Sequence, residues 1–242
     1  MNENIKILII EDDRAVRNLI STTLTINKYK YDLAVNGSDS VLLFTTNKYD
    51  IVFLDLGLPD MEGIDIIKKF REFSTTPIIV ISARTNDEDK IDALDAGADD
   101  FLTKPFNIDE LLARVRSTIR RLNYAETNSV ENNQTFENGD IKIDYPSRSV
   151  YIKGKEIHLM PTEYSLLCLL ANNIGKVLTH QYILKTIWGN YLESDLSSLR
   201  VYMTSLRKKI ENLSGEKYIQ THIGVGYKMI RVNNSDLEKQ NE

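Results

Sequence analysis

The first half of the chain carries polar residues of the types that transfer phosphoryl groups. The acidic run Glu11-Asp12-Asp13 follows one apolar segment, Asp55 and Ser82 end two others, and Lys104 comes after a further one. Neighbouring carboxylates repel one another unless a cation lies between them, and such oxygen ligands suit Mg²⁺. An aspartate can attack phosphorus to form an acyl phosphate, while a lysine and a hydroxyl bind phosphoryl oxygens. The set indicates phosphoryl transfer to an aspartate.

The segments before these residues predict a parallel α/β sheet. We expect strands at 6–10, 31–35, 51–54, 77–81 and 100–102, and helices at 14–26, 38–46, 63–72, 87–96 and 108–122. Parallel strands need crossover connections, so helices should cover both faces of the sheet. Ile7 to Ile10 are all apolar, as expected of a strand buried on both sides. The carboxyl ends of such strands open onto one crevice, which would gather the polar residues.

Length and composition indicate two modest domains. The chain has 242 residues and a net charge of -5. Its apolar runs are shorter than a membrane span and its start resembles no secretory leader, so we expect a cytoplasmic protein. Cys168 is the single cysteine, so the chain cannot form an internal disulfide, and we expect this residue to pack in the core.

The charge is divided unevenly along the chain. Residues 1–122 hold 21 acidic and 16 basic side chains, whereas residues 139–232 hold 8 acidic and 13 basic ones. The polar stretch between them predicts a linker at 123–134, with a second domain at 135–232 and a polar tail at 233–242. A basic module often binds nucleic acid.

Four motifs resemble the receiver domains of two-component response regulators, and the likeness covers residues 5–122. The resemblance implies a flavodoxin-like sheet with strand order 2-1-3-4-5. The matching stretches are Ile7 to Asp13, Asp55-Leu56-Gly57-Leu58-Pro59-Asp60, Ser82-Ala83-Arg84 and Gly97 to Phe106.

The same resemblance assigns roles to the polar residues. Asp55 would be the phosphoacceptor, and Asp12, Asp55 and the Gly57 carbonyl would bind Mg²⁺, with Glu11 acting through water. Lys104 would contact the phosphoryl group, aimed by a Lys-Pro peptide bond that is usually cis in the family. Ser82 and Phe101 would form the pair that switches when the phosphoryl group arrives.

A two-fold dimer face is also implied, because the chain resembles the OmpR/PhoB subfamily of these regulators. Its members dimerise through an apolar patch ringed by ion pairs. Ile91, Leu94 and Ala113 would form the patch here. The expected cross-subunit pairs are Lys90–Glu110, Asp100–Arg114 and Asp99–Arg121.

The second half predicts short strands, three helices and a closing hairpin, and it resembles the winged helix-turn-helix effector domain of that subfamily. The third helix has an apolar stripe and an outer face of short residues beside basic ones, which suits a major groove. Residues 194–211 would be the recognition helix and residues 222–228 the wing. Relatives often carry an arginine early in the wing, where this chain has His222-Ile223. The candidate DNA contacts are Ser197, Arg200, Val201, Thr204, Ser205, Arg207, Lys208 and Lys228.

Details of both halves look closest to the branch that controls potassium-uptake operons. This implies a KdpD-like sensor histidine kinase as phosphoryl donor, promoter DNA with tandem half-sites, and a homodimer formed on phosphorylation. RNA polymerase would contact the loop from Gly189 to Ser194. No membrane partner is expected.

Three other functions are weighed against this one. An aspartyl-phosphate phosphohydrolase normally needs a second Asp two places after the nucleophile, where this chain has Gly57. A flavodoxin-like cofactor binder would have a phosphate loop in place of the acidic run. A regulator that is never phosphorylated would not need the full acid, serine and lysine set. We therefore expect a regulator and not an enzyme with external substrates.

Overall fold

The computed structural model describes residues 4–84, 87–127, 135–189 and 195–232. These fall into two compact units, one ending at Thr118 and the other beginning at Ile119. Among the described helices, none is long and apolar enough to span a bilayer.

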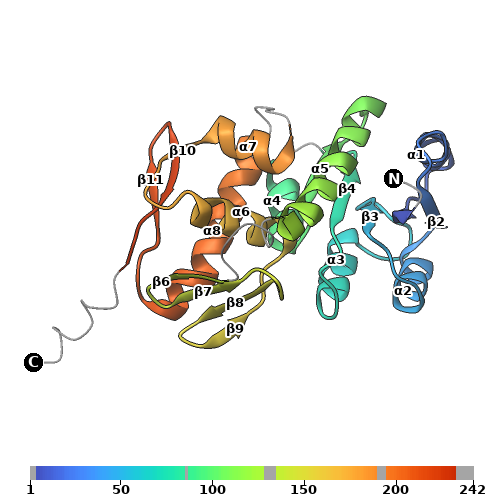
Figure 1. Ribbon diagram of the computed structural model, residues 1–242. Helices are drawn as coiled ribbons and strands as arrows, with labels where there is room; N and C mark the ends of the chain where they lie inside the picture. Colours follow the sequence, from blue (N-terminus) through green and yellow to red (C-terminus); the bar gives the residue numbers. More distant parts are fainter. Residues whose placement is uncertain (1–3, 85–86, 128–134, 190–194, 233–242) are drawn as a thin grey trace, which may run out of the picture. The chain divides into compact units, whose positions relative to one another are not determined.

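The first unit is a five-stranded parallel sheet in the order β2-β1-β3-β4-β5, with helices between successive strands (Figure 1). Right-handed crossovers put α1 on one face and α2, α3 and α4 on the other. The predicted fold is confirmed, and each strand lies within one residue of its expected place. The elements are β1 (Lys6–Ile10), α1 (Arg14–Ile26), β2 (Lys30–Ala34), α2 (Gly37–Thr46), β3 (Ile51–Leu54), α3 (Gly63–Arg71), β4 (Ile78–Ser82), α4 (Asp87–Asp95), β5 (Asp100–Thr103) and α5 (Ile108–Thr127).

Helix α5 continues through residues 123–127, the first part of the segment predicted as a linker. The polar composition of that stretch does not prevent a helix once the preceding turns have nucleated it, because each added residue then needs only one more hydrogen bond. Residues 128–134 and the polar tail at 233–242 lie outside the described residues.

The core of the first unit lies on the central strands. Every residue of β3 and β4 is buried, as are Ile7 to Ile10 of β1. Strand β2 is an edge strand and is only partly covered. Asp13 begins α1 by accepting hydrogen bonds from the backbone N–H groups of Ala15 and Val16. This cap ends the chain's extended run just after Glu11 and Asp12.

The second unit is a winged helix with two antiparallel sheets. Strands β6 (Thr135–Asn138), β7 (Ile141–Asp144), β8 (Ser149–Ile152) and β9 (Lys155–Ile157) pair in sequence order. Helices α6 (Pro161–Asn172), α7 (His180–Trp188) and α8 (Asp195–Ser214) follow. Strand β10 (Leu178–Thr179) pairs with β12 (Gly226–Met229), which also pairs with β11 (Ile219–His222).

The helices of the second unit pack as their sequence patterns predict. Leu199, Met203, Leu206 and Ile210 of α8 are all buried, which confirms the apolar stripe, whereas Leu196 is half-exposed. Thr179 caps α7 through its side chain, and Gly189 ends that helix in a left-handed conformation. Cys168 lies in the core of α6, where burial raises the pKa of its thiol.

Candidate phosphoacceptor site and nucleic-acid interface

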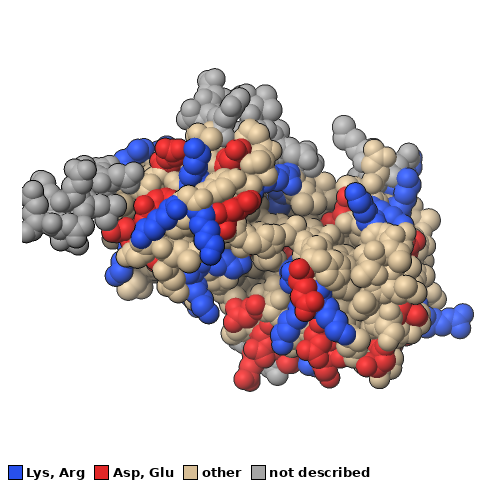
Figure 2. Space-filling model, turned by 90° about the horizontal axis from the view of Figure 1, so that it is seen from below, with Lys and Arg blue, Asp and Glu red and all other residues tan. Residues whose placement is uncertain are grey.

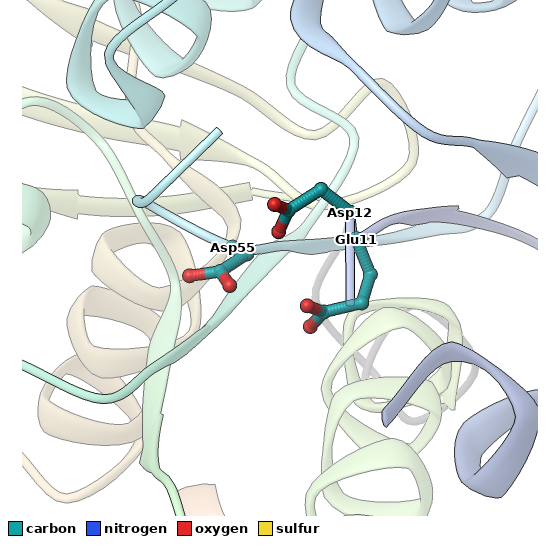
Figure 3. Close-up of side chains that lie close together, drawn as sticks. All are labelled: Glu11, Asp12 and Asp55. Atoms are coloured by element: carbon teal, nitrogen blue, oxygen red, sulfur yellow. The ribbon is translucent and has the colours of Figure 1, made fainter. Parts of the chain in front are cut away.

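The acidic cluster forms because β1 and β3 are neighbours. Ile10 pairs with Leu54, and the Asp55 N–H donates to the Ile10 carbonyl at 2.9 Å. The residues after these strand ends therefore meet at one edge of the sheet. Figure 3 shows the three carboxylates of Glu11, Asp12 and Asp55 gathered there, with oxygens within 4.8 Å of one another.

Lys104 reaches the cluster from the end of β5. Its ammonium lies 2.6 Å from Asp55 Oδ2 and 2.8 Å from Glu11 Oε2. Burial lowers the pKa of Lys104, but its hydrogen bonds to Asp55 and Glu11 outweigh burial and raise that pKa overall. The lysine therefore stays charged beside the acids. Its peptide bond to Pro105 is cis, as the resemblance implies.

The cluster holds more negative charge than Lys104 balances. Burial raises the pKa of Glu11 to about 7, and the charge of Asp55 adds to this effect, while Lys104 offsets part of it. Glu11 and Asp55 are buried, whereas Asp12 is exposed. Three hard carboxylate oxygens with one exposed member fit a partly hydrated divalent cation such as Mg²⁺. Asp13 is occupied by its capping role.

Ser82 and Phe101 lie on the adjacent strands β4 and β5. The Ser82 side chain is buried at the carboxyl end of β4, and its Oγ accepts from the Arg84 N–H at 3.2 Å. Phe101 pairs with Val80 in the sheet and is buried. The serine is at the same sheet edge as Asp55, and the aromatic ring is packed inward.

Two of the aspartates expected to form ion pairs across a dimer have partners within the chain. Arg114 lies 2.7 Å from Asp100 of the same chain and 3.3 Å from Glu110 of the same helix. Asp99 is buried and pairs at 2.8 Å with Arg71. Both aspartates therefore have partners within one chain.

The three residues of the expected apolar patch differ in how exposed they are. Leu94 is buried, whereas Ile91 is 38% exposed and Ala113 is half-buried. Residues three positions apart lie on adjoining sides of a helix, so Leu94 can be packed inward while Ile91 lies at the exposed border. Ile91 is thus the main exposed apolar residue of the predicted patch. Arg121 lies in the later part of α5, which belongs to the second unit because that unit begins at Ile119.

Sequence reasoning missed the role of Arg71. Its guanidinium donates to the carbonyls of Gly97 and Thr76 at 2.8 Å, in addition to binding Asp99. Gly97 adopts φ +114°, and a Cβ there would lie 2.9 Å from Arg71 Cγ. Arg71 thus joins the end of α3 to the starts of β4 and β5. The sequence gave little signal for this role, since Gly97 and Asp99 lie 26 and 28 residues from Arg71.

Helix α8 presents part of the expected DNA-binding face. Arg200, Thr204 and Lys208 are exposed, and Ser197, Val201 and Lys228 are partly exposed. Two members have other partners. The Ser205 hydroxyl donates to Glu163 at 2.6 Å, and Arg207 donates to the Ile219 carbonyl and the Thr221 hydroxyl of β11. These contacts turn both side chains towards the domain itself.

The surface charge is mixed. Figure 2 shows basic and acidic side chains interleaved on the face in view, so neither sign forms a continuous patch there. Residues 190–194, which include most of the loop expected to contact RNA polymerase, lie outside the described residues.

Both halves match known families. Residues 7–116 match the response regulator receiver domain, and residues 154–229 match the C-terminal domain of transcriptional regulatory proteins. Together they cover most of the chain. This chain belongs to the two-component response regulators of the OmpR/PhoB type. Such regulators are DNA-binding transcription factors and not enzymes that turn over external substrates.

Individual relatives are similar to this response regulator over nearly its full length. It is 46% identical to the transcriptional regulatory protein KdpE of Staphylococcus aureus (strain NCTC 8325 / PS 47), over 93% of this chain and 97% of that one. It is 39% identical to the response regulator ArlR of Staphylococcus aureus (strain Mu50 / ATCC 700699), over 92% and 98% of the two chains. The crystal structure of DrrB, a Thermotoga maritima OmpR/PhoB homologue, is 32% identical with a TM-score of 0.50, covering 93% and 99%.

Proposed function

We propose that Asp55 accepts a phosphoryl group from a sensor histidine kinase and that this modification controls DNA binding. The observation that carries the proposal is the meeting of Lys104 with Asp55 and Glu11 at one sheet edge, beside Asp12. A fold needing only rigidity would not place a half-buried lysine beside the buried carboxylates of Glu11 and Asp55, because burying charges is unfavourable.

The chemistry follows from the side chains. A carboxylate oxygen of Asp55 attacks the phosphorus of a phosphohistidine, so a P–O bond forms and the P–N bond breaks. The leaving imidazole takes a proton from water. Lys104 stays charged through the step and can hold a phosphoryl oxygen in place of its contact with Asp55. The Ser82 hydroxyl can donate to another phosphoryl oxygen.

Mg²⁺ is the proposed cofactor. Asp12, Asp55 and the Gly57 carbonyl would bind it, with Glu11 acting through water. When bound, it would neutralise negative charge on the incoming phosphoryl group. The geometry supports this assignment, since the carboxylate oxygens of Glu11, Asp12 and Asp55 lie within 4.8 Å of one another.

The phosphorylated protein is proposed to form a dimer that binds promoter DNA with tandem half-sites. Phosphorylation would move Ser82 and Phe101, and the face built from α4, β5 and α5 would then pair with a second copy. Exposed Ile91 would lie at its centre, beside Lys90 and Glu110. Two winged helices would bind through α8, using Arg200, Val201, Thr204 and Lys208, and RNA polymerase would be contacted next to α7.

Replacing Asp55 with Asn tests the central step. The wild-type chain should take up label from ³²P-acetyl phosphate with Mg²⁺, and hydroxylamine should release that label because acyl phosphates react with it. Asp55→Asn should remove the label, since an amide cannot form the acyl phosphate. The exposed Asp65→Asn on α3 is the matched control and should label normally. Hydroxylamine-sensitive label on Asp55→Asn would contradict the assignment.

The regulon is proposed to be a potassium-uptake operon with a KdpD-like kinase. The chain is 46% identical to the KdpE of Staphylococcus aureus and 39% identical to the ArlR of the same species, which favours this branch. DNA occupancy mapped across the genome in high and low potassium tests it. We expect potassium limitation to increase occupancy upstream of potassium-uptake genes. Occupancy confined to unrelated promoters would reject this regulon and leave the Asp55 chemistry untouched.

A further inference from the structure

The loop between β3 and α3 carries a backbone group that the proposed metal site needs. Gly57 lies in this loop, which spans residues 56–62, and its carbonyl is the only proposed Mg²⁺ ligand that belongs to the backbone. A backbone carbonyl points where the loop directs it, and Gly57 is exposed and has no side chain that could pack against the protein. The direction of this carbonyl therefore depends on what holds the loop.

The two ends of the loop are joined to each other. Gly57 and Glu62 form a short antiparallel bridge, and the Gly63 N–H donates to the Leu56 carbonyl at 3.2 Å. A Cβ on Gly63 would lie 2.6 Å from Leu56 Cα, so the backbone segments at the base of the loop are in close contact. Residues 58–61 lie beyond this base, so their position needs a further support.

Asp60 fastens that part of the loop to the start of α2. Its Oδ1 accepts from the Gly37 N–H at 2.7 Å, and its Oδ2 accepts from the Ser38 N–H at 2.9 Å and from the Ser38 hydroxyl at 2.8 Å. The first N–H groups of a helix have no acceptor within the helix, so an acceptor from elsewhere can bind them. These hydrogen bonds lower the pKa of Asp60, which keeps its carboxylate charged. The link joins segments more than 20 residues apart.

The loop also packs closely on α2. A Cβ on Gly37 would lie 2.8 Å from Met61 Cβ and 3.2 Å from Asp60 Oδ1, so a larger residue there would push the loop away. Helix α2 has a cap of its own as well, because the Asn36 side chain accepts from the Asp39 N–H at 2.7 Å. The contacts of Asp60 therefore add a connection to the loop to a helix that is already capped.

We propose that Asp60 is a positioning residue for the metal site, which fixes the loop on α2 and so holds the Gly57 carbonyl in place for Mg²⁺. This inference rests on the proposed function, in which that carbonyl binds the ion. Mg²⁺ demands a nearly ideal octahedral geometry, so a displaced ligand weakens its binding. Groups that orient metal ligands without touching the metal typically change metal affinity by about ten-fold to a hundred-fold.

The metal affinity of the full chain tests this role. Electron paramagnetic resonance follows free Mn²⁺, which can replace Mg²⁺ at oxygen ligands, and competition with Mg²⁺ then gives the Kd of each ion. Asp60→Ala should raise both Kd values about ten-fold, because the loop loses its support on α2. Asp60→Asn keeps one acceptor oxygen and should raise them about three-fold. If Asp60→Ala does not fold, Asp60→Asn decides the question.

Asn36→Ala is the matched control, because it removes the cap that is made within the first turn of α2. Asn36→Ala and Asp60→Ala should both lower the urea midpoint measured by circular dichroism, since each removes acceptors from the start of the helix. Only Asp60→Ala should weaken metal binding. The comparison separates loss of the loop's support from a general loss of stability in α2.

A labelled carbonyl reports on Gly57 directly. Gly57 is the only glycine in the sequence that is followed by leucine. A chain made with ¹³C at the glycine carbonyl and ¹⁵N at the leucine amide therefore gives a single cross-peak in a spectrum that correlates these two nuclei. Saturating Mg²⁺ should shift this peak in the wild type and in Asn36→Ala. In Asp60→Ala the shift should be less than half as large.

Several outcomes would overturn the inference. Wild-type Kd values in the Asp60 variants would do so, and so would an equal loss of affinity in Asn36→Ala. A full Mg²⁺-induced shift in Asp60→Ala would show that the Gly57 carbonyl is placed without this residue. A wild-type chain that binds neither ion is a distinct result, because it contradicts the proposed metal site and with it the proposed function.

Discussion

Individual charged residues have partners that their neighbours in sequence do not indicate. Asp99 and Asp100 are adjacent, yet Asp99 binds Arg71 and Asp100 binds Arg114. Both aspartates are buried, and a buried carboxylate is stable only when it is paired and hydrogen-bonded. The intramolecular partners account for the burial of both aspartates.

Asp32 should make the first unit sensitive to acid. Its carboxylate accepts hydrogen bonds from Lys6 and the Tyr49 hydroxyl, each at 2.7 Å, and these lower the pKa of Asp32. The stability gained is present above the unfolded-state pKa and is lost as pH falls through the lower folded-state pKa. Asp32→Asn should therefore lose less stability in acid than wild type does.

Urea unfolding of both proteins between pH 7 and pH 2 measures this difference. Asp92→Asn, at an exposed aspartate of α4, is the control and should follow the wild-type profile. Identical acid profiles for Asp32→Asn and wild type would show that the Lys6 and Tyr49 contacts do not stabilise the fold.

At the scale of elements, the start of α6 joins two helices through one buried acid. Glu163 accepts from the Met160 N–H at 2.8 Å, from the Ser205 hydroxyl at 2.6 Å and from Lys209 at 2.6 Å. The first contact caps α6, and the other two hold α8 against it. The orientation of α8, the proposed recognition helix, is therefore held by a residue outside it.

Glu163→Ala should destabilise the second unit by about 3 kcal/mol, because it leaves buried donors and a lysine without their acceptor. Trp188 is the only tryptophan in the chain and is buried in α7, so its fluorescence follows this unit during urea unfolding. Glu156→Ala is the control, since Glu156 is exposed and accepts one hydrogen bond, from Ser149. Its effect should stay within about 0.5 kcal/mol. Equal effects of the two variants would reject this role for Glu163.

At the scale of the whole molecule, activation is expected to change the number of chains in the assembly. Beryllofluoride with Mg²⁺, which imitates the phosphoryl group, should convert the wild-type chain from monomer to dimer in sedimentation. Ile91→Glu should prevent this, because it puts a charge on the exposed apolar residue at the centre of the face. Ile26→Glu on α1 should still dimerise. A normal dimer of Ile91→Glu would exclude the α4 face.

The fold class and the acidic site could be predicted from the sequence alone. Unbroken apolar runs such as Ile7 to Ile10 identify doubly covered strands, and polar residues at the ends of parallel strands must meet at one edge. Local patterns also specified the capped helices and the stripe of α8. These features depend on periodicity and short-range chemistry, which a single segment contains.

The partners of individual charged and apolar side chains could be known only from the folded structure. Arg71 with Asp99, Glu163 with Ser205, and the buried Leu94 beside the exposed Ile91 depend on distances between segments far apart in the chain. Side-chain contacts of this kind follow from how whole elements pack, and no spacing in the sequence encodes them. The same holds for Asp60, whose partners Gly37 and Ser38 lie 23 and 22 residues away in the chain.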